Sequence, residues 1–161
     1  MITIKEITNN LGKYLSNSEF EKFRNEKLIN PTKYNSQLQF IKCKVSKIEI
    51  CFTNERMIRE SDVNKPLIGG KPIFTNFFIF PKTEKYFDIL PFGVTFKDDL
   101  SEIEKKCGKP NEVKKINNVI FGNVTCLFYF IENIKIIFTF DNLENKITQI
   151  GIEQLKKEIT E

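Results

Sequence analysis

The sequence predicts an α+β fold in which helices pack on one face of an antiparallel β-sheet. The first observation is a capped, amphipathic helix between residues 99 and 108 of the 161-residue chain. The second is a series of short segments that alternate apolar and polar residues, as half-buried strands do. The third is that the order of helix and then strands occurs twice, which indicates an internal repeat.

The helix after Asp98 has clear signals at both ends. Asp99 and Glu102 have the spacing of a capping box, and acidic residues suit the positive end of the helix dipole. Gly108 and Pro110 end the helix, because glycine adopts the left-handed conformation and proline cannot continue the helix. Its apolar face consists of Leu100, Ile103 and Cys107.

The first part of the chain is predicted to hold two helices and then strands. Apolar residues at helical spacing place one helix at residues 3–11, and a second helix opens at Ser16 and stops before Pro31. From residue 38 the period changes to two, so residues 38–45 and 47–53 are predicted strands. A short return strand is expected at residues 57–58.

Residues 64–93 contain four of the six prolines and three glycines, and we interpret them as a join between two halves. They are too aromatic to be a disordered linker. Residues 73–80 are apolar on both faces, which fits a buried central strand or a strand whose outer face meets a partner. Residues 86–90 are predicted to pair beside it.

The second part is predicted to contain strands at residues 124–130, 134–140 and 146–152, with short strands or turns at 112–116 and 118–122. The whole chain, 1–161, is then a single domain. Its parts are a first half repeat at about 1–63, the join at 64–93, a second half repeat at about 94–153, and a short, frayed or weakly helical tail at 154–161.

Two local matches support the repeat. Residues 18–22 and 101–105 differ only in an apolar residue, and residues 48–53 resemble residues 134–139. Both matches keep the helix before the strand. Since one half alone has a thin core and an exposed sheet edge, the halves are expected to join into one longer sheet.

This plan, with the Leu-Pro-x-Gly turn at 90–93 and the Ser-Glu-Ile-x-x-x-Cys-Gly-Lys-Pro segment at 101–110, resembles β-lactamase inhibitory protein and small outer-membrane-assembly lipoproteins. It is also similar to immunity proteins of bacterial polymorphic toxin systems. In these families a helix ending in Leu-Gly-x-Pro leads into strands with aromatic pairs, and here Cys107 replaces the leucine. The N-terminus contains no signal sequence or lipid-attachment cysteine, which favours the immunity-like members and a cytoplasmic location.

The composition argues against several kinds of chemistry. The net charge is +4, but the lysines are scattered and no basic stripe for nucleic acid is evident. The chain contains no histidine, and its four cysteines show no metal-binding spacing, so no metal or other cofactor is expected. No stretch has the length of a membrane span. Catalysis could begin only from the carboxylates Asp88, Asp98, Asp99 and Asp141. Of these, Asp98 and Asp99 are better explained as a helix cap and Asp141 as a turn residue.

The resemblance implies a non-enzymatic protein that neutralises a toxin domain, encoded by a neighbouring gene, by occluding its active site. A rigid sheet would present aromatic anchors and charged contacts to such a partner. We predict these contacts to be Phe74, Phe78, Tyr86, Tyr129, Arg56 and Arg59. The alternatives are core packing for the aromatics and plain solvation for the arginines. For the whole protein, the alternative is a non-catalytic ligand- or protein-binding domain, as a monomer or as a homodimer through residues 73–80.

Overall fold

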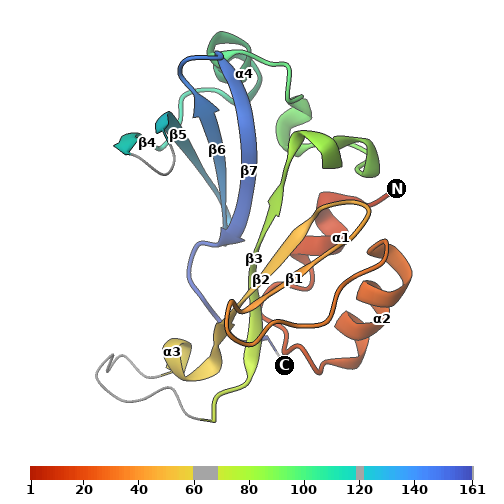
Figure 1. The fold of residues 1–161 in the computed structure, drawn as a ribbon. Coiled ribbons are helices and arrows are strands. Elements are labelled where there is room, and N and C mark those ends of the chain that lie inside the picture. Colours follow the sequence, from red (N-terminus) through yellow and green to blue (C-terminus); the bar gives the residue numbers. More distant parts are fainter. Residues whose placement is uncertain (60–68, 119–121, 161) are drawn as a thin grey trace.

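The computed structural model describes residues 1–59, 69–118 and 122–160, which contain one seven-stranded antiparallel sheet (Figure 1). The strands, in chain order, are β1 (Phe40–Lys42), β2 (Glu49–Asn54), β3 (Pro72–Ile79), β4 (Glu112–Asn118), β5 (Gly122–Ile131), β6 (Ile134–Asp141) and β7 (Lys146–Gln154). The helices are α1 (Ile4–Thr8), α2 (Ser18–Lys27), α3 (Glu55–Arg59) and α4 (Leu100–Cys107), with 3₁₀ helices η1 (Pro81–Tyr86) and η2 (Pro91–Gly93).

The spatial order of the strands is β1-β2-β3-β7-β6-β5-β4. The first strand of each half of the chain therefore lies at an edge of the sheet, and each later strand lies closer to the middle. The last strands of the two halves, β3 and β7, pair there through residues 76–79 and 150–153. This arrangement confirms the predicted α+β class with antiparallel strands. Strands β2 and β6, which hold one of the two sequence matches, both lie next to this junction. Descent of the halves from one repeat stays a prediction.

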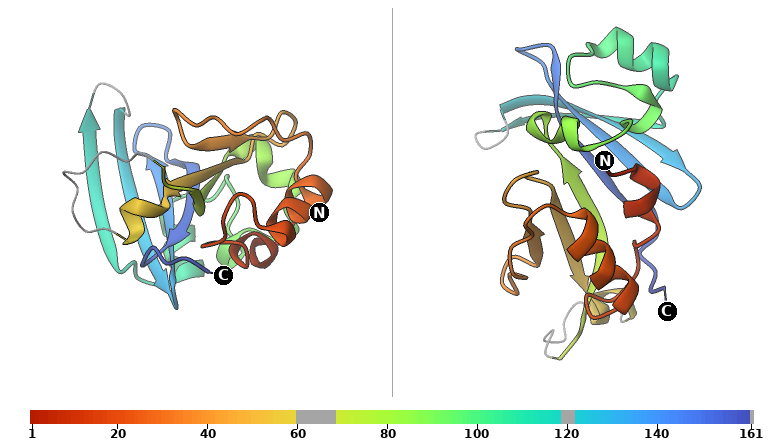
Figure 2. Two further views of the ribbon diagram at one scale, coloured as in Figure 1. Left: turned by 90° about the horizontal axis from the view of Figure 1, so that it is seen from below. Right: turned by 90° about the vertical axis from the view of Figure 1, so that its right-hand side faces the viewer.

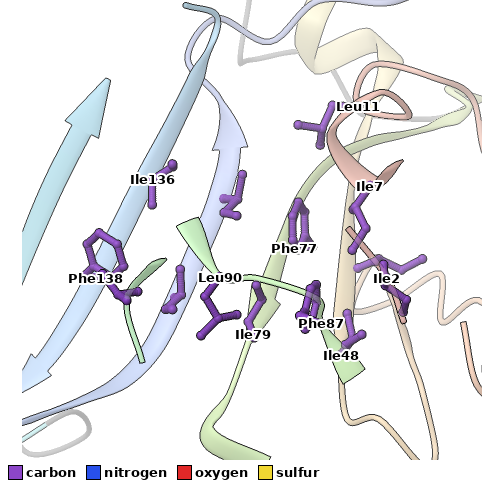
Figure 3. Close-up of a cluster of buried hydrophobic side chains, with 14 of the residues drawn as sticks. Ile2, Ile7, Leu11, Ile48, Phe77, Ile79, Phe87, Leu90, Ile136 and Phe138 are labelled. Carbon is purple, nitrogen blue, oxygen red and sulfur yellow. The ribbon is translucent and has the colours of Figure 1, made fainter. Parts of the chain in front are cut away.

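Helices α1, α2 and α4 lie on the same face of the sheet, as the right-hand view of Figure 2 shows. We call this the covered face and the opposite one the open face. The core lies between the covered face and these helices, and Figure 3 shows part of it. Phe20 of α2 stacks on Phe74 of β3 with ring centroids 4.9 Å apart, and Ile103 of α4 is fully buried. One apolar cluster thus joins both halves.

Strand β3 contains an irregularity that decides which of its side chains reach each face. Cys51 of β2 lies opposite Asn76, whereas the next residue, Phe52, lies opposite Phe74, so Thr75 is an extra residue. A bulge of this kind breaks the strict alternation of side chains between faces. Thr75 is buried there, and its hydroxyl lies 2.9 Å from the hydroxyl of Thr53.

The helix predicted after Asp98 is confirmed as α4. The Asp99 side chain accepts a hydrogen bond from the Glu102 amide at 2.9 Å, and the Glu102 side chain accepts one from the Asp99 amide at 3.0 Å. Gly108 follows the helix with φ +77°, a conformation that is unfavourable for residues other than glycine. The second predicted helix is also confirmed, although Asn17 rather than Ser16 caps it by accepting from Phe20.

Three local predictions are wrong. The strand predicted at 86–90 does not form: Tyr86 is the last residue of the 3₁₀ helix η1, and Phe87 makes only an isolated bridge to Ile2. Pro81 starts η1, and the Thr83 hydroxyl accepts from the Phe80 amide and donates to the Phe80 carbonyl. The return strand predicted at 57–58 belongs to helix α3, where the Asn54 side chain accepts from the Arg56 amide at 2.9 Å.

The third difference is at the C-terminal end. The tail predicted as frayed or weakly helical extends from β7 without a helix, and the Thr160 amide donates to the Gly12 carbonyl at 2.9 Å. The Gln154 side chain also hydrogen-bonds to the backbone of Glu158. The boundary predicted between the first half repeat and the join, at 63–64, lies outside the described residues.

Candidate functional site

Two of the predicted partner contacts are core residues. Phe74 has no exposed surface and stacks on Phe20. Tyr129 is 4% exposed, and its hydroxyl donates to the Gly108 carbonyl at 3.0 Å. Burial raises the pKa of Tyr129 to about 12. The assignment of Phe74 and Tyr129 to a partner surface is therefore corrected: their side chains hold the helices to the covered face.

Phe78 lies on the open face, near the middle of the sheet. It alternates with the core residues Phe77 and Ile79, so its side chain projects to the other side of β3. Its neighbour on β7 is Gly151. A Cβ atom on Gly151 would lie 3.2 Å from the Phe78 ring and 3.7 Å from Cβ of Ile137. A Cβ at position 151 would require the ring to move by a few tenths of an ångström, so the glycine gives the partly exposed ring its room.

Phe78 belongs to one row of side chains that crosses all seven strands, which we call the central row. Strand pairing sets its members side by side from β4 to β1: Glu112, Phe128, Ile137, Gly151, Phe78, Glu49 and Lys42. The row is charged at both ends and apolar in the middle. Buried apolar centres within a polar rim are typical of protein–protein interfaces.

The charges around the central row are paired. Lys135 forms an ion pair with Glu153, Lys42 pairs with Glu49, and Lys114 pairs with Glu112 at 3.1 Å. The ammonium groups of Lys114 and Lys135 also lie 5.1 and 5.8 Å from the centre of the Phe128 ring. They cover this ring, which is only 8% exposed. These contacts hold the lysine stems over the apolar centre while their charges stay at its border.

The other predicted contacts lie elsewhere. Arg56 and Arg59 are on α3, which follows directly on β2, and the Arg59 guanidinium donates to the Tyr14 hydroxyl at 3.2 Å. Tyr86 is the last residue of η1, with the Lys85 ammonium 5.2 Å from its ring centre. Of the six predicted residues, only Phe78 belongs to the central row.

The surroundings of Asp98 and of two cysteine thiols, Cys51 and Cys107, set their ionisation. Burial opposes ionisation of Asp98, but hydrogen bonds from Lys106 and Thr95 outweigh it and lower the pKa of this carboxyl. Burial raises the pKa of the Cys107 thiol to about 11, and burial together with Glu49 does the same for Cys51, so neither forms a nucleophilic thiolate readily. The described residues contain no cluster of three or more potential metal ligands.

Phe128 and Ile137 were not among the residues predicted from the sequence to contact a partner. The strands that hold them were predicted, but their apolar patterns do not reveal which face meets the helices. One signal was present: Gly151 lies between Ile150 and Ile152 inside a predicted strand, and a glycine inside a strand often marks close approach of another group. Here that group is the Phe78 ring.

No protein-family model matches the sequence, and no curated protein matches it. Among solved structures, the chain is similar to the crystal structure of a DUF4309 family protein, YjgB, from Bacillus subtilis, with a TM-score of 0.39 and 9% sequence identity. The similarity covers 80% of this chain and 66% of that protein, just under two thirds of its length. Across the residues that the structure describes, no helix is long and apolar enough to cross a membrane.

Proposed function

We propose that this chain is a cytoplasmic immunity protein that binds a bacterial toxin domain and occludes its active site. The observation that supports this most is the central row, with Phe78 in the middle of the open face and charges at either end. A central aromatic residue surrounded by a polar rim is the usual composition of a strong binding surface. The resemblance of the helix-and-turn segments to immunity proteins points the same way.

A sheet face is a suitable surface for tight inhibition because it is already ordered. The backbone of β3 is hydrogen-bonded to β2 on one side and to β7 on the other. The Phe78 ring also packs closely over Gly151 of β7. A partner that binds there pays little conformational entropy, since the anchor does not have to be ordered on binding.

The charges suggest how specificity would arise. The ion pairs of Lys135 with Glu153 and of Lys42 with Glu49 are partly exposed, so each contributes little to folding and can exchange its partner on binding. The net charge of +4 suits a toxin whose active site is acidic. Complementary charge would then raise the association rate and reject other partners.

Calorimetry tests the proposal directly. The titrant is the C-terminal domain of the protein encoded by the neighbouring gene, and we expect nanomolar binding with loss of that domain's activity. Phe78→Ala is expected to weaken binding at least thirtyfold, which corresponds to roughly 2 kcal/mol.

Phe92→Ala is the matched control. Phe92 is also a partly exposed phenylalanine, 38% exposed, but its ring packs on Tyr129 and Phe138 of the covered face. We expect this variant to bind within twofold of the natural protein. If Phe78→Ala binds as tightly as Phe92→Ala, the open face is not the binding surface. If the natural, folded protein does not bind, that neighbour is not its toxin.

A further inference from the structure

A shallow groove runs along η1 and meets one end of the central row at Lys42 and Glu49. It consists of three hollows, each of about 400–530 Å³, that share lining residues. The middle hollow, which Val45 and Glu84 line, shares Lys47, Pro81 and Lys82 with one neighbour and Lys85 and Tyr86 with the other. Since neighbouring hollows have walls in common, they form one elongated groove. Its shape fits an extended chain better than a compact small molecule.

The groove lies between two segments that are far apart in the sequence. One wall is the connection between β1 and β2, which contributes Val45 and Lys47, and the other is η1. Figure 1 shows this connection next to η1. The proline at the start of η1 and the Thr83 hydroxyl bonds to Phe80 fix the second wall. The groove is therefore preformed and does not need a conformational change to open.

Three lysines line the groove without an ion pair in the described part of the chain: Lys47, Lys82 and Lys85. This differs from Lys114 and Lys135 on the open face, which are paired with glutamates. Lys42, in the same groove, is already paired with Glu49. The free cations give the groove a positive charge that a negatively charged occupant would neutralise.

Lys47 is held in an unusual backbone conformation. Its φ is +61°, in the left-handed region that residues with a side chain disfavour, and its amide donates to the Cys43 carbonyl at 3.0 Å. The neighbouring Ser46 is fully buried. This turn directs a lysine, rather than the glycine that the backbone would favour, into the wall of the groove.

The remaining lining favours a polypeptide over a nucleic acid. Val45, Pro81 and Tyr86 offer apolar surface that can receive side chains. Glu84 and Glu49 line the same hollows and would repel a continuous phosphate backbone, whereas the carboxylates of a polypeptide can be spaced between them. Among the described residues, no arginine lines the groove to clamp a phosphate with two hydrogen bonds.

We propose that this groove binds an extended, acidic segment of a partner protein, with its carboxylates on Lys47, Lys82 and Lys85 and an apolar side chain against Pro81 and Tyr86. The inference goes beyond the toxin-binding proposal, because the groove extends along η1 beyond the end of the central row and its occupant does not have to be a toxin. It provides a second contact area for whichever protein carries such a segment.

The test uses a blocked hexapeptide, Glu-Leu-Glu-Glu-Leu-Glu, titrated at low salt into the isotope-labelled full chain and followed by NMR. We expect the largest amide shifts at Val45, Lys47 and residues 82–86. The triple variant Lys47→Gly, Lys82→Gln, Lys85→Gln is expected to bind the peptide at least tenfold more weakly. Glycine is chosen at position 47 because it accepts the left-handed backbone.

A second triple variant, Lys33→Gln, Lys97→Gln, Lys109→Gln, removes the same number of charges at exposed positions outside the groove. It should bind the peptide as the natural protein does. Equal weakening in both triple variants would reduce the effect to net charge and overturn the proposal. So would shifts confined to other residues, no binding at millimolar peptide, or tighter binding of a thymidine hexanucleotide at the same amides, which would assign the groove to nucleic acid.

Discussion

At the residue scale, two phenylalanines of one strand have opposite roles. Phe74 is fully buried against α2, whereas Phe78 lies on the open face. They are four positions apart, and strict alternation would place them on the same face. The extra residue Thr75 shifts the alternation by one, so the two rings end on different sides of the sheet.

Substitution to alanine should separate these roles. Phe74→Ala leaves a cavity in the core and is expected to lower the free energy of unfolding by about 3–5 kcal/mol. Phe78→Ala removes a ring that is only partly buried, so we expect a loss of about 1–2 kcal/mol. Urea denaturation of the two variants measures the difference. An equal loss in both would mean that Phe78 is a core residue and not a binding anchor.

Lys47 gives a second prediction at this scale. Because its φ of +61° is unfavourable for any residue with a Cβ, Lys47→Gly should raise the free energy of unfolding by about 0.5–1 kcal/mol. Gly108→Ala is the opposite case: with φ +77° and ψ −167° the backbone is in a region that essentially only glycine adopts, so the substitution should lower stability by about 1–3 kcal/mol. Thermal or urea unfolding measures both. A destabilised Lys47→Gly would show that the lysine side chain is needed for folding.

The bulge also explains why the site was predicted only in part. The apolar pattern of residues 73–80 predicted a strand correctly, and Phe78 was among the chosen residues. The same pattern led to the prediction that Phe74 contacts a partner. That prediction is wrong, because the extra residue in β3 cannot be recognised from the apolar pattern. The prediction that Tyr129 contacts a partner is also wrong. Its strand, β5, is buried over six consecutive residues, so composition does not distinguish the two faces of that strand.

At the element scale, a helix defined by neighbouring residues was predicted correctly, whereas the length of a strand that depends on distant contacts was not. Helix α4 was predictable because its cap, apolar face and terminal glycine all lie within ten residues. β1 was predicted as an eight-residue strand, but only three residues pair with β2. Strand length depends on the partner strand and on surrounding loops, and the sequence of one segment does not contain that information.

The packing of α1 on α2 supplies a prediction about pH. The Glu6 carboxylate accepts from the Thr3 amide at 2.8 Å and pairs with Lys27 of α2 at 2.9 Å. The hydrogen bond from Thr3 and then that from Lys27 lower the pKa of Glu6 to about 2. A lowered pKa in the folded state adds stability above the unfolded value of 4.5, and this stability is lost as pH falls from 4.5 toward 2.

Glu6 is about one third exposed, so we expect its contribution above pH 5 to be about 1 kcal/mol rather than the larger figure that the pKa alone implies. Glu6→Gln should remove this contribution at neutral pH and flatten the loss of stability between pH 5 and pH 2. Urea titrations at several pH values measure it. Parallel curves for the natural protein and Glu6→Gln would contradict the assignment.

At the scale of the whole molecule, the two halves share one core across a short junction. Only residues 76–79 of β3 pair with residues 150–153 of β7, but Ile152 lies there fully buried between Phe77 and Ile136. Apolar contact across the junction, more than the few backbone hydrogen bonds, should make the halves unfold together.

Ile152→Ala tests this coupling. We expect it to lower the free energy of opening by about 2–5 kcal/mol, and by the same amount for slowly exchanging amides of β2 and of β6. Native-state hydrogen exchange measures both strands in one experiment. Val113→Ala, at a 50% exposed position of β4, is the control and should change neither by more than about 0.5 kcal/mol. A loss confined to β6 would mean that the halves open separately.

The position of β7 also sets the order in which a newly made chain can complete its sheet. Strand β3 emerges from the ribosome before β4, β5 and β6, yet one of its edges is covered only by β7. Until then a strand containing Ile73, Phe74, Phe77 and Ile79 offers open backbone groups to any other strand nearby. The last strand to be synthesised thus closes the sheet at its centre, and a chain that stopped before Lys146 would leave edges of both β3 and β6 unpaired, which favours aggregation.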